Sequence, residues 1–118
     1  IIDSNIITIY KYKVIDKIFD EMYGEEDFDN LISKGNYLVD FYADWCGPCK
    51  MLGSVLETIS DIEIIKVNVD EYPVLASRFK IMSIPHLKFF NDGKEIDHIV
   101  GFVDKETIEE KVMELNNL

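Results

Sequence analysis

The sequence predicts a single α/β domain with a central mixed β-sheet flanked by helices on both faces. Two long apolar runs, residues 37–43 and 62–69, are typical of strands that are covered on both sides. Segments with helical spacing of apolar residues lie between the strands. The chain has 118 residues, a length that suits one compact domain with one sizeable core.

The first 24 residues have the least regular pattern. Residues 6–15 are β-branched and aromatic with partial alternation, and residues 15–19 form a second, shorter candidate strand. We expect one of these segments to pair at the edge of the sheet and the other to be an extension. The chain is therefore divided into an N-terminal extension with an edge strand, residues 1–24, and a main domain, residues 25–118.

From residue 25 onward, the pattern predicts helices and strands in alternation. Residues 25–34 carry Phe28, Leu31 and Ile32 at helical spacing, and Gly35 is suited to end that helix. The remaining segments are, in order, the strand 37–43, a helix through 51–59, the strand 62–69, a short helix 72–79 entered through Pro73, the hairpin strands 86–90 and 95–100, and a last helix capped by Asp104.

The charge balance argues against two classes of partner. The chain carries 23 acidic and 12 basic residues, which gives a formal net charge of −11. A surface of that sign repels phosphate backbones and anionic lipid headgroups. No run approaches the ~18 apolar residues of a membrane span. We therefore expect no nucleic-acid partner and no membrane span.

The cysteine usage also bounds the chemistry. The chain has only two cysteines, which are too few for a disulfide framework. A tetrahedral zinc site would need further ligands, and His86 and His98 supply them poorly. We therefore expect no metal site.

Cys46 and Cys49 lie three residues apart at the start of a predicted helix. This spacing brings both thiols to one side within a turn, near the ~5.5–6 Å Cα separation that a disulfide prefers. The helix N-terminus favours a thiolate at Cys46, which is therefore the predicted nucleophile. Cys49 lies one turn inside the helix and is expected to be more buried, which suits it to the resolving step. Gly47 allows a tight approach, and Pro48 stiffens the helix start. The alternative interpretations are half of a metal site or two incidental core thiols.

Residues 39–50, Val-Asp-Phe-Tyr-Ala-Asp-Trp-Cys-Gly-Pro-Cys-Lys, resemble the active-site strand and helix start of thioredoxins. Residues 66–70, 83–85 and 93–101 match later landmarks of that family in order and spacing, so the resemblance covers about residue 24 to the C-terminus. Cys-Gly-Pro-Cys favours thioredoxin over glutaredoxin or protein disulfide isomerase domains. The resemblance implies a thioredoxin fold and a protein-disulfide reductase that works through a reversible Cys46–Cys49 couple. It also implies no bound cofactor, because a flavin-dependent thioredoxin reductase supplies the electrons in this family.

The resemblance assigns further catalytic roles. Asp40 matches the buried aspartate that helps to deprotonate the resolving cysteine through water, and a raised carboxyl pKa is what such a proton acceptor needs. Lys66 matches the lysine near that aspartate. The alternatives are a polar residue at a strand edge for Asp40 and a surface lysine without catalytic importance for Lys66.

The resemblance also implies a substrate-binding rim around the disulfide. Pro85 matches a cis-proline that faces the disulfide and leaves the Ile84 backbone free to bind an extended substrate segment. The residues of this rim are Trp45, Gly47, Pro48, Ile84, Pro85, His86 and Gly101. Ordinary core packing is the alternative for Trp45 and Ile84.

Three positions depart from the family pattern. His86 follows Pro85 where thioredoxins usually have threonine. If His86 lies near Cys46, a protonated imidazole would lower the pKa of the Cys46 thiol. The alternative is a histidine on the rim that takes no part in the chemistry. Ser54 replaces a helix-kinking proline, which predicts a straighter helix. The connection at residues 60–62 is shorter than usual, which trims the helix or its loop.

Other functions and locations stay open at this point. The same dithiol is expected to run in the opposite direction in an oxidase or isomerase, and an adaptor would use the surface without the chemistry. The chain is rich in isoleucine, with many Asp, Glu, Lys and Asn residues, and carries an N-terminal extension that opens at Ile1 rather than at methionine. Together these features resemble secreted thioredoxins of malaria parasites. That resemblance implies attachment to a protein-export assembly. The expected location is a secretory or vacuolar compartment if a leader was removed, and the cytoplasm otherwise.

Overall fold

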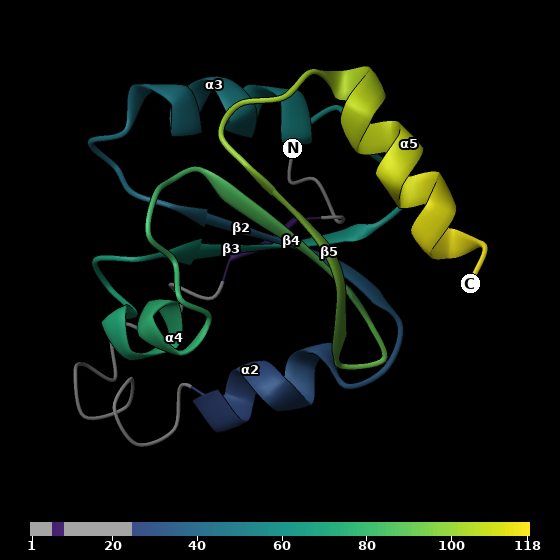
Figure 1. Cartoon of the computed structure of the whole chain (residues 1–118), viewed down its shortest axis with the longest axis horizontal. Helices are drawn as coiled ribbons and strands as arrows, with labels where there is room; N and C mark the ends of the chain where they lie inside the picture. Colours follow the sequence, from purple (N-terminus) through teal and green to yellow (C-terminus); the bar gives the residue numbers. More distant parts are fainter. Residues whose placement is uncertain (1–5, 9–24) are drawn as a thin grey trace.

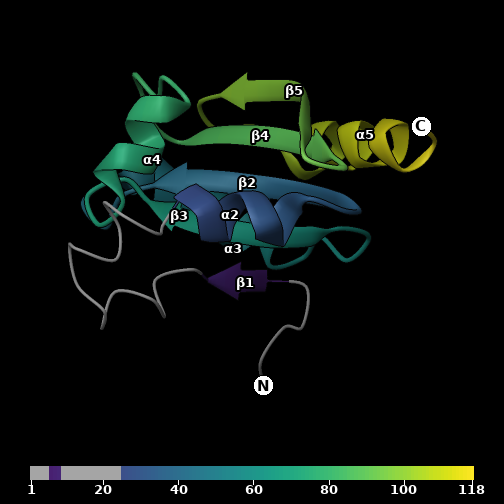
Figure 2. The same ribbon diagram turned by 90° about the horizontal axis from the view of Figure 1, so that it is seen from below.

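A computed structural model describes residues 6–8 and 25–118 of the protein. Within these residues, one five-stranded sheet has the order β1-β3-β2-β4-β5 (Figures 1 and 2). The strands are β1 (Ile6–Thr8), β2 (Asn36–Tyr42), β3 (Glu63–Asn68), β4 (His86–Asn91) and β5 (Lys94–Val100). β3 pairs in parallel with both β1 and β2, whereas β4 is antiparallel to both β2 and β5. The mixed sheet predicted from the sequence is therefore confirmed.

Helices cover both faces of the sheet. They are α2 (Glu25–Ile32), α3 (Gly47–Leu56), α4 (Pro73–Arg78) and α5 (Lys105–Asn116). In Figure 1, α3 and α5 lie on one face and α2 and α4 on the other. None of the helices in the described part of the chain has the length and hydropathy that crossing a membrane requires.

The side chains of β2 contribute to two hydrophobic clusters, one on each face of the sheet, because successive side chains of a strand point to opposite faces. Leu38 belongs to the cluster under α3 and α5, whereas Val39 and Phe41 belong to the cluster over α2 and α4. All three side chains are fully buried. The continuous apolar run of β2 is thus explained by a strand in the interior of the sheet with helices on either side.

The local signals account for several element boundaries. Asp92 and Gly93 both have positive φ angles, of 48° and 83°, as a tight β4–β5 turn requires. Asp104 caps α5 by accepting a 2.9 Å hydrogen bond from the backbone N–H of Thr107. The helical pattern predicted through Ile59 is longer than α3, which ends at Leu56, although Ile59 is still buried.

The N-terminal segment is described only in part. β1 forms the edge of the sheet, with Ile7 opposite Ile65 of β3, and falls inside the first of the two candidate strands. The second candidate strand, residues 15–19, lies outside the described residues. The division of the chain at residue 24 stays a prediction.

Candidate active site

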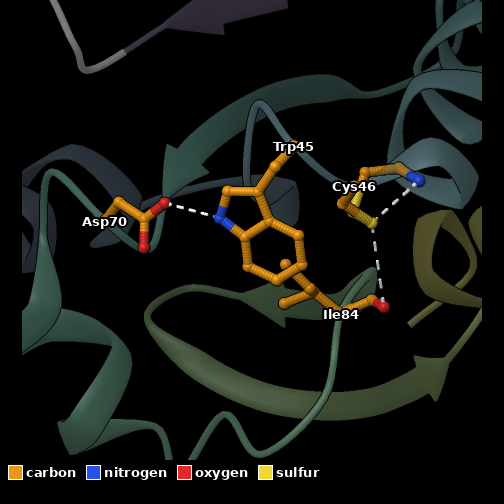
Figure 3. The surroundings of a disulfide bond; sticks show 5 residues. Trp45, Cys46, Asp70 and Ile84 are labelled. Carbon is orange, nitrogen blue, oxygen red and sulfur yellow. Dashed lines mark hydrogen bonds between the residues drawn. A yellow bond between two sulfur atoms is a disulfide. The ribbon is translucent and has the colours of Figure 1, made fainter.

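The redox centre is a disulfide between Cys46 and Cys49 at the N-terminus of α3 (Figure 3). Their Cα atoms are 5.2 Å apart, within the range that a disulfide accepts. Cys46 is the N-cap of α3, Gly47 begins the helix, and Pro48 stands in the first turn, where it removes no helical hydrogen bond. The sequence spacing therefore gives the expected local geometry.

The two sulfurs differ in their electrostatic surroundings more than in their exposure. Cys46 Sγ accepts a 3.1 Å hydrogen bond from the backbone N–H of Cys49. Cys46 and Cys49 are 4% and 3% exposed, so Cys49 is hardly the more buried of the two. The position of Cys46 at the positive end of α3, and not a difference in burial, is what favours negative charge on its sulfur.

The loop before β4 faces the disulfide. The Ile84–Pro85 peptide bond is cis, as the family resemblance implied. The carbonyl oxygen of Ile84 lies 3.9 Å from Cys46 Sγ (Figure 3). The Ile84 side chain packs against the cluster of Ala43 and the two cysteines. Pro85 accepts a 2.8 Å hydrogen bond from the N–H of Gly101. Ile84, Pro85 and Gly101 are therefore brought together beside Cys46.

Trp45 lies on the surface next to Cys46. Its side chain is 71% exposed, so the alternative of core packing is wrong for this residue. The indole Nε1–H donates a 2.8 Å hydrogen bond to Asp70 Oδ2 in the turn after β3 (Figure 3). This bond fixes an exposed apolar ring at the edge of the redox centre.

Asp40 lies in the middle of β2 and is fully buried. Neither carboxyl oxygen has a hydrogen-bond partner within residues 6–8 and 25–118. Burial raises the pKa of Asp40 to about 7, against the opposing attraction of Lys66. The alternative of a polar residue at a strand edge is therefore wrong, and the group exchanges its proton near neutral pH.

A pocket of about 330 Å³ lies next to Cys49. Tyr42, Gly53 and Lys66 line it, from β2, α3 and β3. Lys66 pairs in register with Asp40 across the two strands, and its Nζ lies 4.7 Å from the centroid of the Tyr42 ring. The lysine that the resemblance singled out is thus half-buried at the redox centre.

His86 does not supply the positive charge that one interpretation of the sequence required. Its side chain is 8% exposed and packs with Phe41 and His98 at ring separations of 6.4 Å and 5.4 Å. Burial lowers the pKa of His86 to about 4, with further lowering by Lys88 and His98. The imidazole is neutral at pH 7, so the prediction of a protonated imidazole that stabilises the thiolate is wrong. The ring is also buried, whereas a spectator on the rim would be exposed.

Sequence reasoning missed several contacts of the site. The sequence pattern does not distinguish Asp70 and Tyr42, although both belong to segments that resemble the family. Lys88, 6% exposed, pairs with Glu95 at 2.9 Å across the β4–β5 hairpin. This ion pair depends on the register of β4 with β5, and a shift in that register between Phe89 and Phe90 keeps the turn at Asp92 from predicting it.

This arrangement suits one kind of chemistry, the exchange of a disulfide between this chain and another molecule. The thiol–disulfide oxidoreductases are the class of protein that the fold and the site define. In the described part of the chain, histidines, cysteines and carboxylates do not gather in groups of three or more that could hold a metal.

Comparison with known proteins identifies the family. A family model named Thioredoxin matches residues 21–114. The thioredoxin of Chlamydia caviae is 47% identical over 87 residues, which are 70% of this chain and 85% of the relative. A Staphylococcus aureus thioredoxin is 45% identical over 91 residues, which are 73% and 88% of the two chains.

Solved structures agree with these relatives. A mutant thioredoxin from Halobacterium salinarum superposes with a TM-score of 0.74 at 36% identity, over 79% of this chain and 86% of its own. Oxidised mitochondrial thioredoxin 3 from Saccharomyces cerevisiae superposes with a TM-score of 0.70 at 32% identity, over 77% of this chain and 90% of its own. The chain belongs to the thioredoxin family. It is a protein-disulfide reductase of the thioredoxin type.

Proposed function

We propose that Cys46 is the attacking thiol and Cys49 the resolving thiol when this reductase acts on protein disulfides. The observation that carries the assignment is the N–H of Cys49, which donates to Cys46 Sγ at the N-terminus of α3. The same donor and the helix dipole stabilise a thiolate at Cys46 after reduction.

The reaction has two exchanges that balance in sulfur and charge. The Cys46 thiolate attacks a substrate disulfide, forms a mixed disulfide, and releases one substrate sulfur as a thiolate. The Cys49 thiol then loses its proton to the Asp40 carboxylate through a bridging water and attacks Cys46 Sγ, which breaks the mixed disulfide and releases the second substrate sulfur as a thiolate. The two substrate thiolates take up the proton held by Asp40 and one from solvent. The products are a dithiol substrate and the Cys46–Cys49 disulfide. A pKa of about 7 at Asp40 suits this acceptor role near neutrality.

The rim residues are proposed to receive the substrate chain. Three observations support this: Trp45 is exposed and adjacent to Cys46 in the chain, the Ile84 carbonyl lies 3.9 Å from Cys46 Sγ, and Gly101 is hydrogen-bonded to Pro85 next to Ile84. Gly47 and Pro48 are both exposed beside it. An extended peptide that carries a disulfide fits such a surface, because its backbone can pair with the Ile84 segment.

Electrons are proposed to come from a flavin-dependent thioredoxin reductase, so that this chain needs no bound cofactor. That partner and the attachment to a protein-export assembly follow from resemblance alone. The adaptor function and the oxidase or isomerase function are not favoured by the family relatives.

The test is a trapping experiment with Cys49→Ser. Without the resolving thiol, mixed disulfides between Cys46 and substrate proteins should accumulate in lysate and be cleaved by added reductant. Cys46→Ser with Cys49→Ser is the control, and it should trap nothing. If the single variant trapped no mixed disulfide, the assignment would be overturned. Proteins that stay bound to the double variant in the presence of reductant would favour the adaptor function.

The direction of the exchange is tested by equilibrating the Cys46–Cys49 couple with glutathione. A potential near ~−270 mV supports a reductant, and one near ~−120 mV would identify an oxidant.

A further inference from the structure

The ring of Tyr42 and the ammonium of Lys66 form a contact that the reaction above does not use. Lys66 Nζ lies 4.7 Å from the ring centroid, within the ~6 Å range of a cation–π interaction. A methyl group added at Gly53 would lie 3.6 Å from the same nitrogen. The ammonium is therefore held between β2 and helix α3, inside the pocket next to Cys49.

Tyr42 and Asp40 share a face of β2, because they are two residues apart in one strand. Lys66 pairs with Asp40 in register, yet within the described residues neither Asp40 oxygen accepts a hydrogen bond from its nitrogen. The Lys66 ammonium therefore acts on the buried carboxyl through its charge, from a position beside the Tyr42 ring.

Two carboxylates at the pocket attract the same ammonium, and a second ammonium repels it. Asp44 and Glu57 are exposed carboxylates that line the pocket, and Lys50 lines it from α3. Without the ring, a flexible lysine gains solvation and carboxylate partners by moving outward. Burial raises the pKa of the Tyr42 phenol above its ordinary value, and the carboxylates of Asp44, Glu71 and Asp40 raise it further. A hydrogen bond with Asn68 opposes them, but the net direction is upward, so the ring stays neutral.

We propose that Tyr42 is a positioning residue whose ring retains the Lys66 ammonium in the pocket next to Cys49, where that charge stabilises the Asp40 carboxylate. This inference rests on the proposed role of Asp40 in the resolving step. A cation–π contact at a partly exposed site corresponds to roughly a two- to fivefold preference for the ring-bound position.

The first experiment titrates the Asp40 carboxyl by carbon NMR in the oxidised full chain, where the cysteines do not titrate. Tyr42→Leu should raise the Asp40 pKa by about half a unit to one unit, less than loss of a direct ion pair would. Tyr42→Phe and Tyr42→Trp keep a ring and should leave it near the wild-type value. Tyr37→Leu, in the same strand, is the matched control and should also leave it unchanged.

A double-mutant cycle separates positioning from a general effect of the substitution. In a Lys66→Gln background, Tyr42→Leu should no longer move the Asp40 pKa, because the charge that the ring positions is gone. An unchanged or lowered pKa in Tyr42→Leu, or the same rise in the Lys66→Gln background, would overturn the proposal.

A second measurement needs no substitution. The side-chain protons next to Lys66 Nζ should have upfield ring-current shifts in the wild-type protein, and ordinary shifts would overturn the proposal even if Tyr42→Leu failed to fold. The rate of the resolving step in Tyr42→Leu should follow the displaced Asp40 pKa. If that pKa moves and the rate profile does not, the positioning role of Tyr42 stands and the proposed role of Asp40 fails.

Discussion

Replacement of Asp40 by asparagine tests the energetic cost of the buried carboxyl. In an unfolded chain this group loses its proton near its ordinary pKa of 3.8, whereas in the folded protein the pKa is about 7. Between these values the folded state holds more protons than the unfolded state. The free energy of unfolding must therefore fall as the pH rises through this interval.

The size of the effect follows from the two pKa values. The full difference of about 3 pKa units corresponds to about 4 kcal/mol, of which about 2.5 kcal/mol is lost between pH 5 and pH 8. The asparagine amide carries its own cost, about 1–3 kcal/mol if it finds no partner, but that cost does not depend on pH. The free energy of unfolding of Asp40→Asn, relative to that of the wild type, should therefore rise by about 2.5 kcal/mol between pH 5 and pH 8.

Urea unfolding of the two oxidised proteins at pH 5 and pH 8 measures this difference directly. The remaining titratable groups are common to both proteins and cancel to a first approximation. If the stability gap between the proteins were the same at both pH values, Asp40 would not hold its proton to neutrality, and its role as proton acceptor would lose its basis.

Three further outcomes are expected. His86, with a pKa of about 4, should not titrate between pH 5.5 and pH 8 by NMR, and its burial should lower stability as the pH falls from 6.5 towards 4; a midpoint near 6.5 would contradict this account. Asp70→Ala should free the indole of Trp45, lower its fluorescence anisotropy and raise KM for a protein disulfide roughly fivefold with kcat little changed. An unaltered anisotropy would show that the hydrogen bond does not hold the ring. Glu95→Gln should cost about 2 kcal/mol in urea unfolding, because it leaves the buried Lys88 ammonium without its carboxylate.

The ion-pair prediction has a matched control in the same protein. Lys105 and Glu109 form an exposed pair at 4.0 Å along α5. Glu109→Gln should change stability by less than about 0.5 kcal/mol. Equal effects of Glu95→Gln and Glu109→Gln would show that burial of the Lys88 ammonium is not what makes its pair matter.

Much of the fold follows from local pattern. The apolar run at 37–43 indicates a strand inside a sheet because two cores must cover it, and Asp92-Gly93 indicates the hairpin because both residues tolerate positive φ. The placement of Cys46 at a helix start follows from the spacing of two thiols and a proline. Each of these signals lies within a few residues of its consequence.

The parts that sequence did not reveal depend on distant partners. The bond from Trp45 to Asp70 spans 25 positions, and nothing near either residue specifies it. The sequence allows His86 to be a cation, because its burial and its neighbours Lys88 and His98 are set by the pairing of β4 with β5. A pKa is a property of the packed surroundings, and those are known only once strand register is known.

The dual position of Cys46, as attacking thiol and as N-cap of α3, affects how inactive variants should be made. Serine is among the preferred N-cap residues, whereas alanine supplies no acceptor and costs a helix about 0.5–2 kcal/mol. Cys46→Ala would therefore remove the attacking thiol and the N-cap acceptor together. Cys46→Ser removes the thiol but keeps an acceptor for the N–H of Cys49. The difference in free energy of unfolding between the two variants measures how much the N-cap acceptor at this position stabilises the helix start.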